Sequence, residues 1–188
     1  RVLFRSKTAL TWRKYLDEQY ANGIWNTNAC PIVIRYAEVL LTYAEAVNEL
    51  SGPSADVYDK LDLIRGRVGM PKVDREKYAS KETLRRLIRR ERGVELAGEG
   101  VRRADILRWK DDNGKMVAET VLNGVLERVV GTVNYAETDP TKRAEIDTNA
   151  PVTDKKIEDR VFKVHNRYNP IPQGAIDNNP NLEQNPGY

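Results

Sequence analysis

The sequence predicts a mainly α fold: a tetratricopeptide-like helical-hairpin scaffold with long irregular loops and a small β element near the C-terminus. Apolar residues recur at helical spacing over residues 35–50 and again over residues 54–68. The short break between them, Ser51-Gly52-Pro53, suits a helix end followed by a tight turn. Two helices joined in this way form a hairpin, and alanines on its surface suit the close packing of tetratricopeptide-like units.

The first helix is expected over Arg35–Leu50, where apolar residues form two adjoining stripes. One stripe holds Tyr36, Leu40, Tyr43, Val47 and Leu50, and the other holds Ala37, Leu41 and Ala44. A helix with two such stripes is expected to pack between neighbours. Ser54 is expected to cap the second helix, which runs to about Val68.

A third helix is expected to begin after Ser80 and to run toward Ala97. Its apolar stripe consists of Leu84, Leu87, Ile88 and Val94. Gly98 and Gly100 break the pattern, and residues 101–110 predict a short fourth helix. The helical core is therefore expected to occupy about residues 35–110.

The chain changes character after this helical core. Residues 111–160 are polar and rich in turn residues, which predicts a loop-rich excursion. Over residues 161–168 apolar and polar side chains alternate, and this pattern predicts a short strand. The prolines of the last twenty residues favour an extended tail, so residues 161–188 are expected to form a strand followed by extended chain.

The charge is high but nearly balanced, with 31 basic and 28 acidic residues and a net charge of +3. The stretch RRLIRRERGVELAGEGVRRADILRWK, residues 85–110, carries most of the clustered arginines. Glu91, Glu95, Glu99 and Asp105 interrupt these arginines within single helical turns. A nucleic-acid site needs a positive face largely free of carboxylates, so no nucleic-acid partner is expected.

Glu91 and Glu95 also invite a catalytic interpretation, because acid–base chemistry often uses paired carboxylates. Such a pair must converge across a cleft, whereas these two lie four residues apart on one helix among guanidinium groups. Those cations favour the ionised carboxylates and ion pairing across helix contacts. The arginines expected to pair with them are Arg35, Arg65, Arg67, Arg92 and Arg103.

Cys30 and His165 are the only residues of their types in the sequence. A single cysteine excludes an internal disulfide framework and a multi-cysteine metal site, and we expect its thiol to be buried. A single histidine excludes a site built on histidine pairs. Residues 111–114, DDNG, lack the spacing of an EF-hand loop, so neither a metal nor a cofactor is expected.

Several segments together resemble the SusD/RagB family of outer-membrane glycan-binding lipoproteins. The segments are TWRKY at 11–15, RYAEVLLTYAEAVN at 35–48, LDLIRGRVGMP at 61–71, RERGVELAGEGVRRADILRW at 90–109, NPIPQ at 169–173 and NPNLEQNPGY at 179–188. They occur in the order that the family shows and cover most of the chain outside residues 111–160. The resemblance implies that residues 1–188 are the C-terminal part of a SusD/RagB-like domain whose N-terminal half lies upstream.

The resemblance also implies a function. Members of the family are binding proteins rather than enzymes, and they take up oligosaccharide or polysaccharide at the cell surface. Their tetratricopeptide-like scaffold contacts a SusC-like TonB-dependent transporter of the outer membrane. Attachment to that membrane is implied through a lipidated N-terminal cysteine, which this chain does not contain and which Cys30 does not replace.

The shared segments consist of helix-packing residues, so they do not locate a sugar site. Sugar binding needs an aromatic face and planar polar side chains. Tyr20 and Trp25, in a stretch that contains glycine and asparagine, and Tyr135, in the loop-rich excursion, are the candidate ligand-binding residues. Ordinary loop packing is the alternative for each. For the whole protein, the alternatives are a helical-repeat protein-interaction scaffold without glycan binding and, less favoured, a glycoside hydrolase.

Overall fold

The computed structural model of the chain describes residues 14–15, 30, 32–134, 136–139 and 142–188. These residues fall into two compact units, Lys14–Arg103 and Ala104–Tyr188. None of the helices in the described ranges combines the length and the apolar character needed to cross a membrane.

The first unit begins with the predicted helical hairpin. Helix α1 spans Tyr36–Ser51 and ends at Gly52, whose φ of 79° lies in the left-handed region that glycine adopts without strain. Helix α2 spans Ala55–Arg67, and the hydroxyl of Ser54 caps it by accepting a hydrogen bond from the Val57 backbone N–H at 3.3 Å. The hairpin and its cap residues are thus confirmed.

Helix α3 spans Lys81–Glu95 and begins with a capping box. In this box the Ser80 side chain accepts from the Thr83 backbone N–H, while the Thr83 hydroxyl oxygen accepts from the Ser80 backbone N–H. Helix α4 spans Arg102–Arg108 and follows a break that contains Gly98 at a φ of 79°. The third and fourth predicted helices are therefore present, each slightly shorter than expected.

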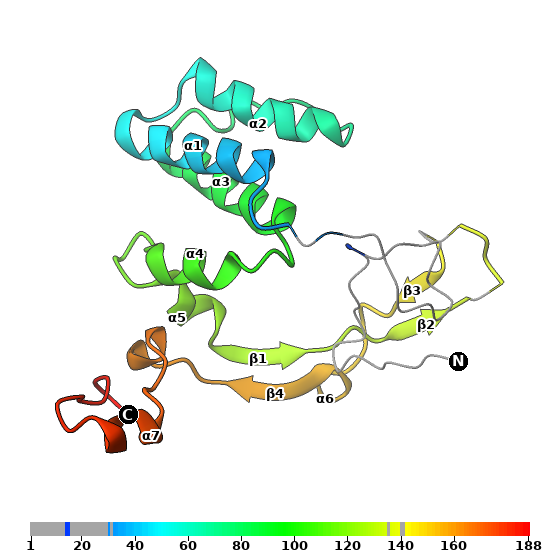
Figure 1. Cartoon of the computed structure of the whole chain (residues 1–188). Coiled ribbons are helices and arrows are strands. Elements are labelled where there is room, and N and C mark those ends of the chain that lie inside the picture. The colour runs from blue at the N-terminus through cyan, green and yellow to red at the C-terminus, as the bar shows by residue number, and fades with distance from the viewer. Residues whose placement is uncertain (1–13, 16–29, 31, 135, 140–141) are drawn as a thin grey trace. The chain divides into compact units, whose positions relative to one another are not determined.

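Helix α1 packs against both α2 and α3, and Figure 1 shows the three helices side by side. Their contacts bury one apolar core. Its most deeply buried members are Leu41, Ala44, Val57, Leu61, Leu84, Ile88 and Leu96. The helical spacing of these residues places them on the facing sides of the three helices, which is why the sequence shows a period of about 3.6.

Helix α1 packs between α2 and α3 as predicted, but one of its two stripes is only partly covered. Leu41 and Ala44 are fully buried, whereas Tyr36 and Leu50 are 70% and 85% exposed. The buried side continues instead through polar Asn48, whose side-chain N–H donates to the Lys81 carbonyl oxygen at 3.1 Å. The end of α1 is thereby tied to the start of α3.

The apolar stripe expected on α3 also changes course near its C-terminal end. Leu84, Leu87 and Ile88 are buried as predicted, but Val94 is 71% exposed. Near this end of α3 the buried side chain is that of Arg92 rather than that of Val94. The inner face of α3 therefore becomes charged over its last turns, and this change positions the ion pairs described below.

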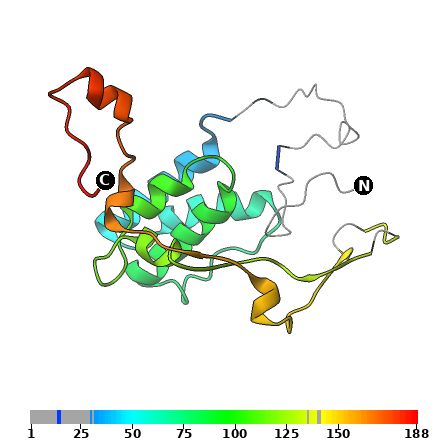
Figure 2. The ribbon, with the colours of Figure 1, turned by 90° about the horizontal axis from the view of Figure 1, so that it is seen from below.

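The second unit contains short helices and two small antiparallel sheets. Strand β1 pairs with β4, and β2 pairs with β3, so that each sheet has two strands. The bounds are α5 Val117–Val121, β1 Gly124–Glu127, β2 Gly131–Val133, β3 Ala144–Ile146, α6 Val152–Lys155 and β4 Lys156–Arg160. In both views the β1 and β4 segments run alongside each other as a ribbon (Figure 1, Figure 2).

The predicted strand over residues 161–168 is wrong. Strand β4 ends at Arg160, and Val164–Arg167 forms the 3-10 helix η2. The Asn166 side chain favours this turn because its Oδ1 accepts the Lys163 backbone N–H at 2.8 Å. The alternation of apolar and polar residues over 161–168 therefore does not correspond to a paired strand.

The tail also departs from the fully extended chain that its prolines predict. Helix α7 spans Gln173–Asn178 and begins directly after Pro172, whose φ of −55° suits the start of a helix. Further along, Gln184 pairs with the backbone of Ile171, accepting its N–H at 2.8 Å and donating to its carbonyl oxygen at 3.0 Å. Side-chain to backbone bonds therefore hold a tail that has few regular elements.

Candidate functional site

The three aromatic residues that the sequence suggested for sugar binding, Tyr20, Trp25 and Tyr135, lie outside the described residues. Cys30 is described, and it is exposed rather than buried as expected. The described ranges contain no group of three or more His, Cys, Asp or Glu side chains that could hold a metal ion.

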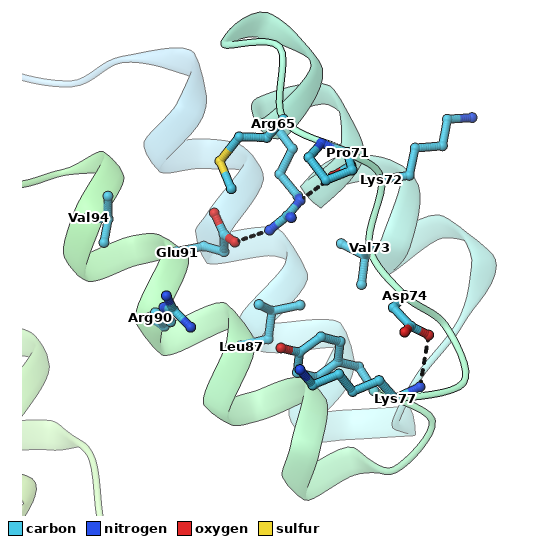
Figure 3. Close-up of a pocket in the computed structure, with 12 residues that line it drawn as sticks. Arg65, Pro71, Lys72, Val73, Asp74, Lys77, Leu87, Arg90, Glu91 and Val94 are labelled. Carbon is cyan, nitrogen blue, oxygen red and sulfur yellow. Dashed lines mark hydrogen bonds and ion pairs between the residues drawn. The ribbon is translucent and has the colours of Figure 1, made fainter. Parts of the chain in front are cut away.

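Glu91 lies on the inner face of α3 and faces Arg65 of α2. The Arg65 Nη1 to Glu91 Oε1 distance is 2.5 Å, and both side chains are 14% exposed. The Nε of the same guanidinium donates to the Pro71 carbonyl oxygen at 2.7 Å, as Figure 3 shows. The planar fork of arginine thus binds a helix and a loop at once.

One turn further on, Glu95 and Glu99 share the cation of Arg35. Its Nη1 lies 2.6 Å from Glu95 Oε1 and its Nε lies 2.7 Å from Glu99 Oε2. Arg67 adds a second contact to Glu95, with Nη2 at 2.6 Å from Oε1. Lys14 pairs with Glu99 and donates to the backbone oxygen of Glu95 at 2.9 Å.

The electrostatics of this cluster keep Glu99 and Arg35 ionised. Burial would raise the pKa of Glu99, but hydrogen bonds from Arg35 and Lys14 outweigh burial and hold this pKa below its ordinary value. The hydrogen bond to Glu99, supported by Glu95, raises the pKa of Arg35 against the opposing effect of burial. A charged carboxylate held by two cations is suited to joining helices and poorly suited to proton transfer.

Arginines at the start and the end of α3 also face carboxylates of α1. Arg85 pairs with Glu49, which lowers the pKa of that carboxyl, chiefly through the hydrogen bond between them. Arg92 is buried, donates to the Thr42 hydroxyl at 3.0 Å and lies 3.7 Å from Glu38. The predicted ion pairing of the arginine-rich stretch is thus confirmed for Arg35, Arg65, Arg67 and Arg92.

A pocket of about 470 Å³ opens between α3 and the loop that precedes it (Figure 3). The loop takes its shape from backbone contacts with side chains of α2. Asp62 Oδ1 accepts the Val73 N–H at 2.7 Å, and the Tyr58 hydroxyl donates to the Tyr78 carbonyl oxygen at 2.8 Å. Asp74 then turns the chain by accepting the Lys77 backbone N–H at 3.0 Å.

The pocket has an apolar floor and a cationic lining. The apolar residues are Met70, Pro71, Val73, Tyr78, Leu87 and Val94, and the charged residues are Arg65, Lys72, Asp74, Lys77, Arg90 and Glu91. Four of these side chains are cations and two are carboxylates, so the lining carries a net positive charge. Such a combination can accept an anionic group that is attached to a partly apolar body.

Comparison with known families decides the assignment. The model of the SusD family matches residues 3–188. The chain belongs to the SusD family. This membership confirms the resemblance carried by the segments from TWRKY to NPGY, and the match also includes residues 111–160, which those segments leave out.

Two curated relatives of this SusD-family chain come from Formosa agariphila. SusD-like protein P25 is 40% identical over 79 residues, which are 42% of this chain and 15% of that protein. SusD-like protein P2 is 38% identical over 93 residues, which are 47% of this chain and 18% of that protein. The matches therefore span less than a fifth of the length of these relatives.

A solved SusD-like protein from Bacteroides fragilis NCTC 9343 supports the fold. It is 28% identical with a TM-score of 0.62, and the match covers 84% of this chain and 26% of that chain. The mainly α fold class with small strands, predicted from the sequence, is confirmed by this similarity and by the observed helices.

Sequence reasoning missed the pocket of this SusD-family chain. The predicted helices leave residues 72–79 without an assigned element, whereas in the structure Val73 is buried and Tyr78 packs against the core. The available signal was an apolar residue next to a lysine at both ends of this segment, Lys72-Val73 and Lys77-Tyr78. That pattern favours a loop anchored by its apolar members with its lysines at the surface.

Proposed function

We propose that the whole protein is a non-catalytic glycan-binding subunit that delivers oligosaccharide or polysaccharide to a SusC-like TonB-dependent outer-membrane transporter. The observation that carries this proposal is the match of the SusD family to residues 3–188. Residues 1–188 would form the C-terminal part of one SusD/RagB-like domain. A lipid anchor outside this chain would hold the protein at the outer membrane, on the cell surface.

The geometry supports a structural rather than a catalytic role for the carboxylates of α3 and of the turn after it. Glu91, Glu95 and Glu99 are all engaged by arginine or lysine. A general acid needs a carboxyl group that holds its proton near neutral pH, and the cations beside Glu99 lower its pKa instead. These residues would therefore stabilise the scaffold and would not act chemically on a bound sugar. Tyr20, Trp25 and Tyr135 remain the candidate sugar-stacking residues.

The proposal is tested by isothermal titration of the full-length protein against a panel of neutral and acidic polysaccharides. We expect saturable binding to at least one polysaccharide and no release of reducing sugar from it. A folded full-length protein that binds no member of a broad panel would contradict the proposal. Hydrolysis of a bound polysaccharide, abolished by one Glu→Gln change, would contradict the non-catalytic part.

A scaffold that binds only a protein partner is the second candidate, and the outer side of α1 favours it. Ile34, Val39 and Tyr43 remain 71%, 51% and 44% exposed beside a shallow hollow of about 380 Å³. Exposed apolar groups that lie together often mark protein contacts. Co-purification of a transporter together with failure to bind glycans would favour this candidate over the first.

A further inference from the structure

Two cations of the pocket between α3 and its preceding loop are not neutralised by the protein. Among the residues that the structure describes, no carboxylate forms an ion pair with Lys77 or Arg90. Arg65 differs, because Glu91 and the Pro71 carbonyl oxygen already hold its guanidinium. The charge available to a ligand therefore belongs to Lys77 and Arg90, with Lys72 at the rim of the loop.

The pocket also offers an apolar surface next to these cations. Leu87 and Val73 are buried at its base, 4% exposed each, and the accessible apolar surface belongs to Met70 and Val94 of the lining, which are 47% and 71% exposed. The ring of Tyr78 lies beside Lys77, whose Nζ is 5.5 Å from the ring centroid. The volume, about 470 Å³, falls in the range of small-ligand sites.

A sugar ring that carries an acidic substituent matches this arrangement. Its apolar face can contact side chains such as Met70 and Tyr78, and its anionic group can reach a guanidinium or an ammonium. A neutral sugar would leave Lys77 and Arg90 without a counter-charge. The surplus of cations therefore favours acidic over neutral glycans.

We propose that this pocket binds an acidic sugar unit, whose carboxylate or sulfate ester is held by Lys77 and Arg90. The inference rests on the proposed glycan-binding function and adds the ligand class and a place for it. Lys72 contributes long-range attraction from the rim, and Arg65 positions the pocket wall through Glu91.

The first test is a lysine footprint of the full-length protein. The protein is acetylated with an N-hydroxysuccinimide ester alone, with oligogalacturonate, with a sulfated galactan oligosaccharide and with a neutral galactan oligosaccharide. We expect both anionic ligands to protect Lys77, and Lys72 more weakly, against acetylation. Lys115 is exposed and lies outside the pocket, so its acetylation should not change. The carboxylate and sulfate arms show which anionic group is preferred.

The second test compares matched variants by isothermal titration. Lys77→Gln and Arg90→Gln should each weaken binding of the preferred anionic oligosaccharide about tenfold, because each removes a charge-assisted hydrogen bond. Lys115→Gln and Arg86→Gln remove the same charges from exposed positions that do not line the pocket, and they should leave the affinity unchanged. The affinity of the parent protein should fall as salt is added, while that of Lys77→Gln should fall less steeply.

The outcomes separate this inference from the proposed function. Binding of neutral galactan without any protection of Lys77 by the anionic oligosaccharides would overturn the inference and leave the function in place. A peptide of Asp and Glu residues serves as a further ligand in the same acetylation experiment. If it protected Lys77 as strongly as the anionic oligosaccharides do, the inference would also be overturned, since the pocket would then recognise protein carboxylates. If none of the three oligosaccharides bound and Lys77 were acetylated equally in every arm, the inference would be overturned. The proposed function would fail only if the protein also bound no member of the broader polysaccharide panel.

Discussion

The Arg65 guanidinium lies 2.5 Å from the Glu91 carboxylate, and each side chain is only 14% exposed. The same guanidinium donates to the Pro71 carbonyl oxygen, so one side chain joins α2, the following loop and α3. Few water molecules can reach this pair. Its loss should therefore destabilise the protein more than the loss of an exposed ion pair, because the remaining charge is not fully rehydrated.

Replacing Glu91 by alanine should lower the free energy of unfolding by about 2–3 kcal/mol. This is somewhat less than the 3–5 kcal/mol that follows the breaking of a fully buried pair, because residual exposure lets water screen the stranded Arg65. Urea and thermal unfolding of the full-length protein would measure the change.

Two further variants test whether the stability lost in Glu91→Ala comes from the broken ion pair. Glu76→Ala removes an exposed carboxylate from the preceding loop and should change stability by less than about 0.5 kcal/mol. The double variant Arg65→Met with Glu91→Leu should recover much of the loss, since it removes both charges together. If Glu91→Ala were as stable as Glu76→Ala, the structural role of the pair would be wrong.

Stability should depend on Glu99 in the acidic range. Its pKa in the folded protein is lowered, so its contribution is present above the unfolded pKa of about 4.3 and is lost as the pH falls through the folded value. Glu99→Gln should therefore be less stable than the parent at pH 7. The difference should shrink below a pH of about 4.

Unfolding followed by fluorescence across this pH range would measure the effect. Glu76→Gln is the matched control, and its stability should run parallel to that of the parent. A Glu99→Gln variant whose deficit stays constant from neutral to acidic pH would show that the lost contact is not ionic.

Local signals explain why the helix ends and the ion pairs could be predicted from the sequence. The hydroxyls of Ser54 and Ser80 bind backbone groups only three residues away, so these serines mark where helices start. Gly52 has no side chain and can take the positive φ at a helix end, so it marks where a helix stops. Glu91 and Glu95 follow the apolar residues of α3 at helical spacing, which predicts that they lie near the helix contacts.

Other features depend on partners that are distant in sequence. Strand β4, KIEDR, contains a single apolar residue, so its side chains show no alternation. Pairing with β1 supplies its backbone hydrogen bonds instead. The pocket likewise depends on contacts across the loop, from Asp62 to Val73 and from Tyr58 to Tyr78. Such contacts leave no periodic pattern in the sequence, and the pocket was therefore missed.

The two stripes of α1 should respond very differently to truncation. Leu41 is fully buried against α2 and α3, so Leu41→Ala should cost about 2–5 kcal/mol through lost burial and the cavity left behind. Leu50 is 85% exposed, and Leu50→Ala should change stability by less than about 0.5 kcal/mol. Chemical denaturation of both variants would measure the contrast. Equal losses would mean that the outer stripe is also covered in the whole protein.

Truncating the proposed sugar-stacking residues should reduce affinity without reducing stability. Trp25→Ala, Tyr20→Ala or Tyr135→Ala should weaken glycan binding about two- to tenfold, the range expected for one lost aromatic contact. Tyr36→Ala is the control, because Tyr36 is an exposed aromatic residue of the helical scaffold. Isothermal titration with the best polysaccharide of the panel measures each affinity, and thermal unfolding confirms that each variant is folded. If the three candidate variants bound as tightly as the parent while Tyr36→Ala bound weakly, the sugar would stack on Tyr36 of α1, and the three candidates would be ordinary loop residues.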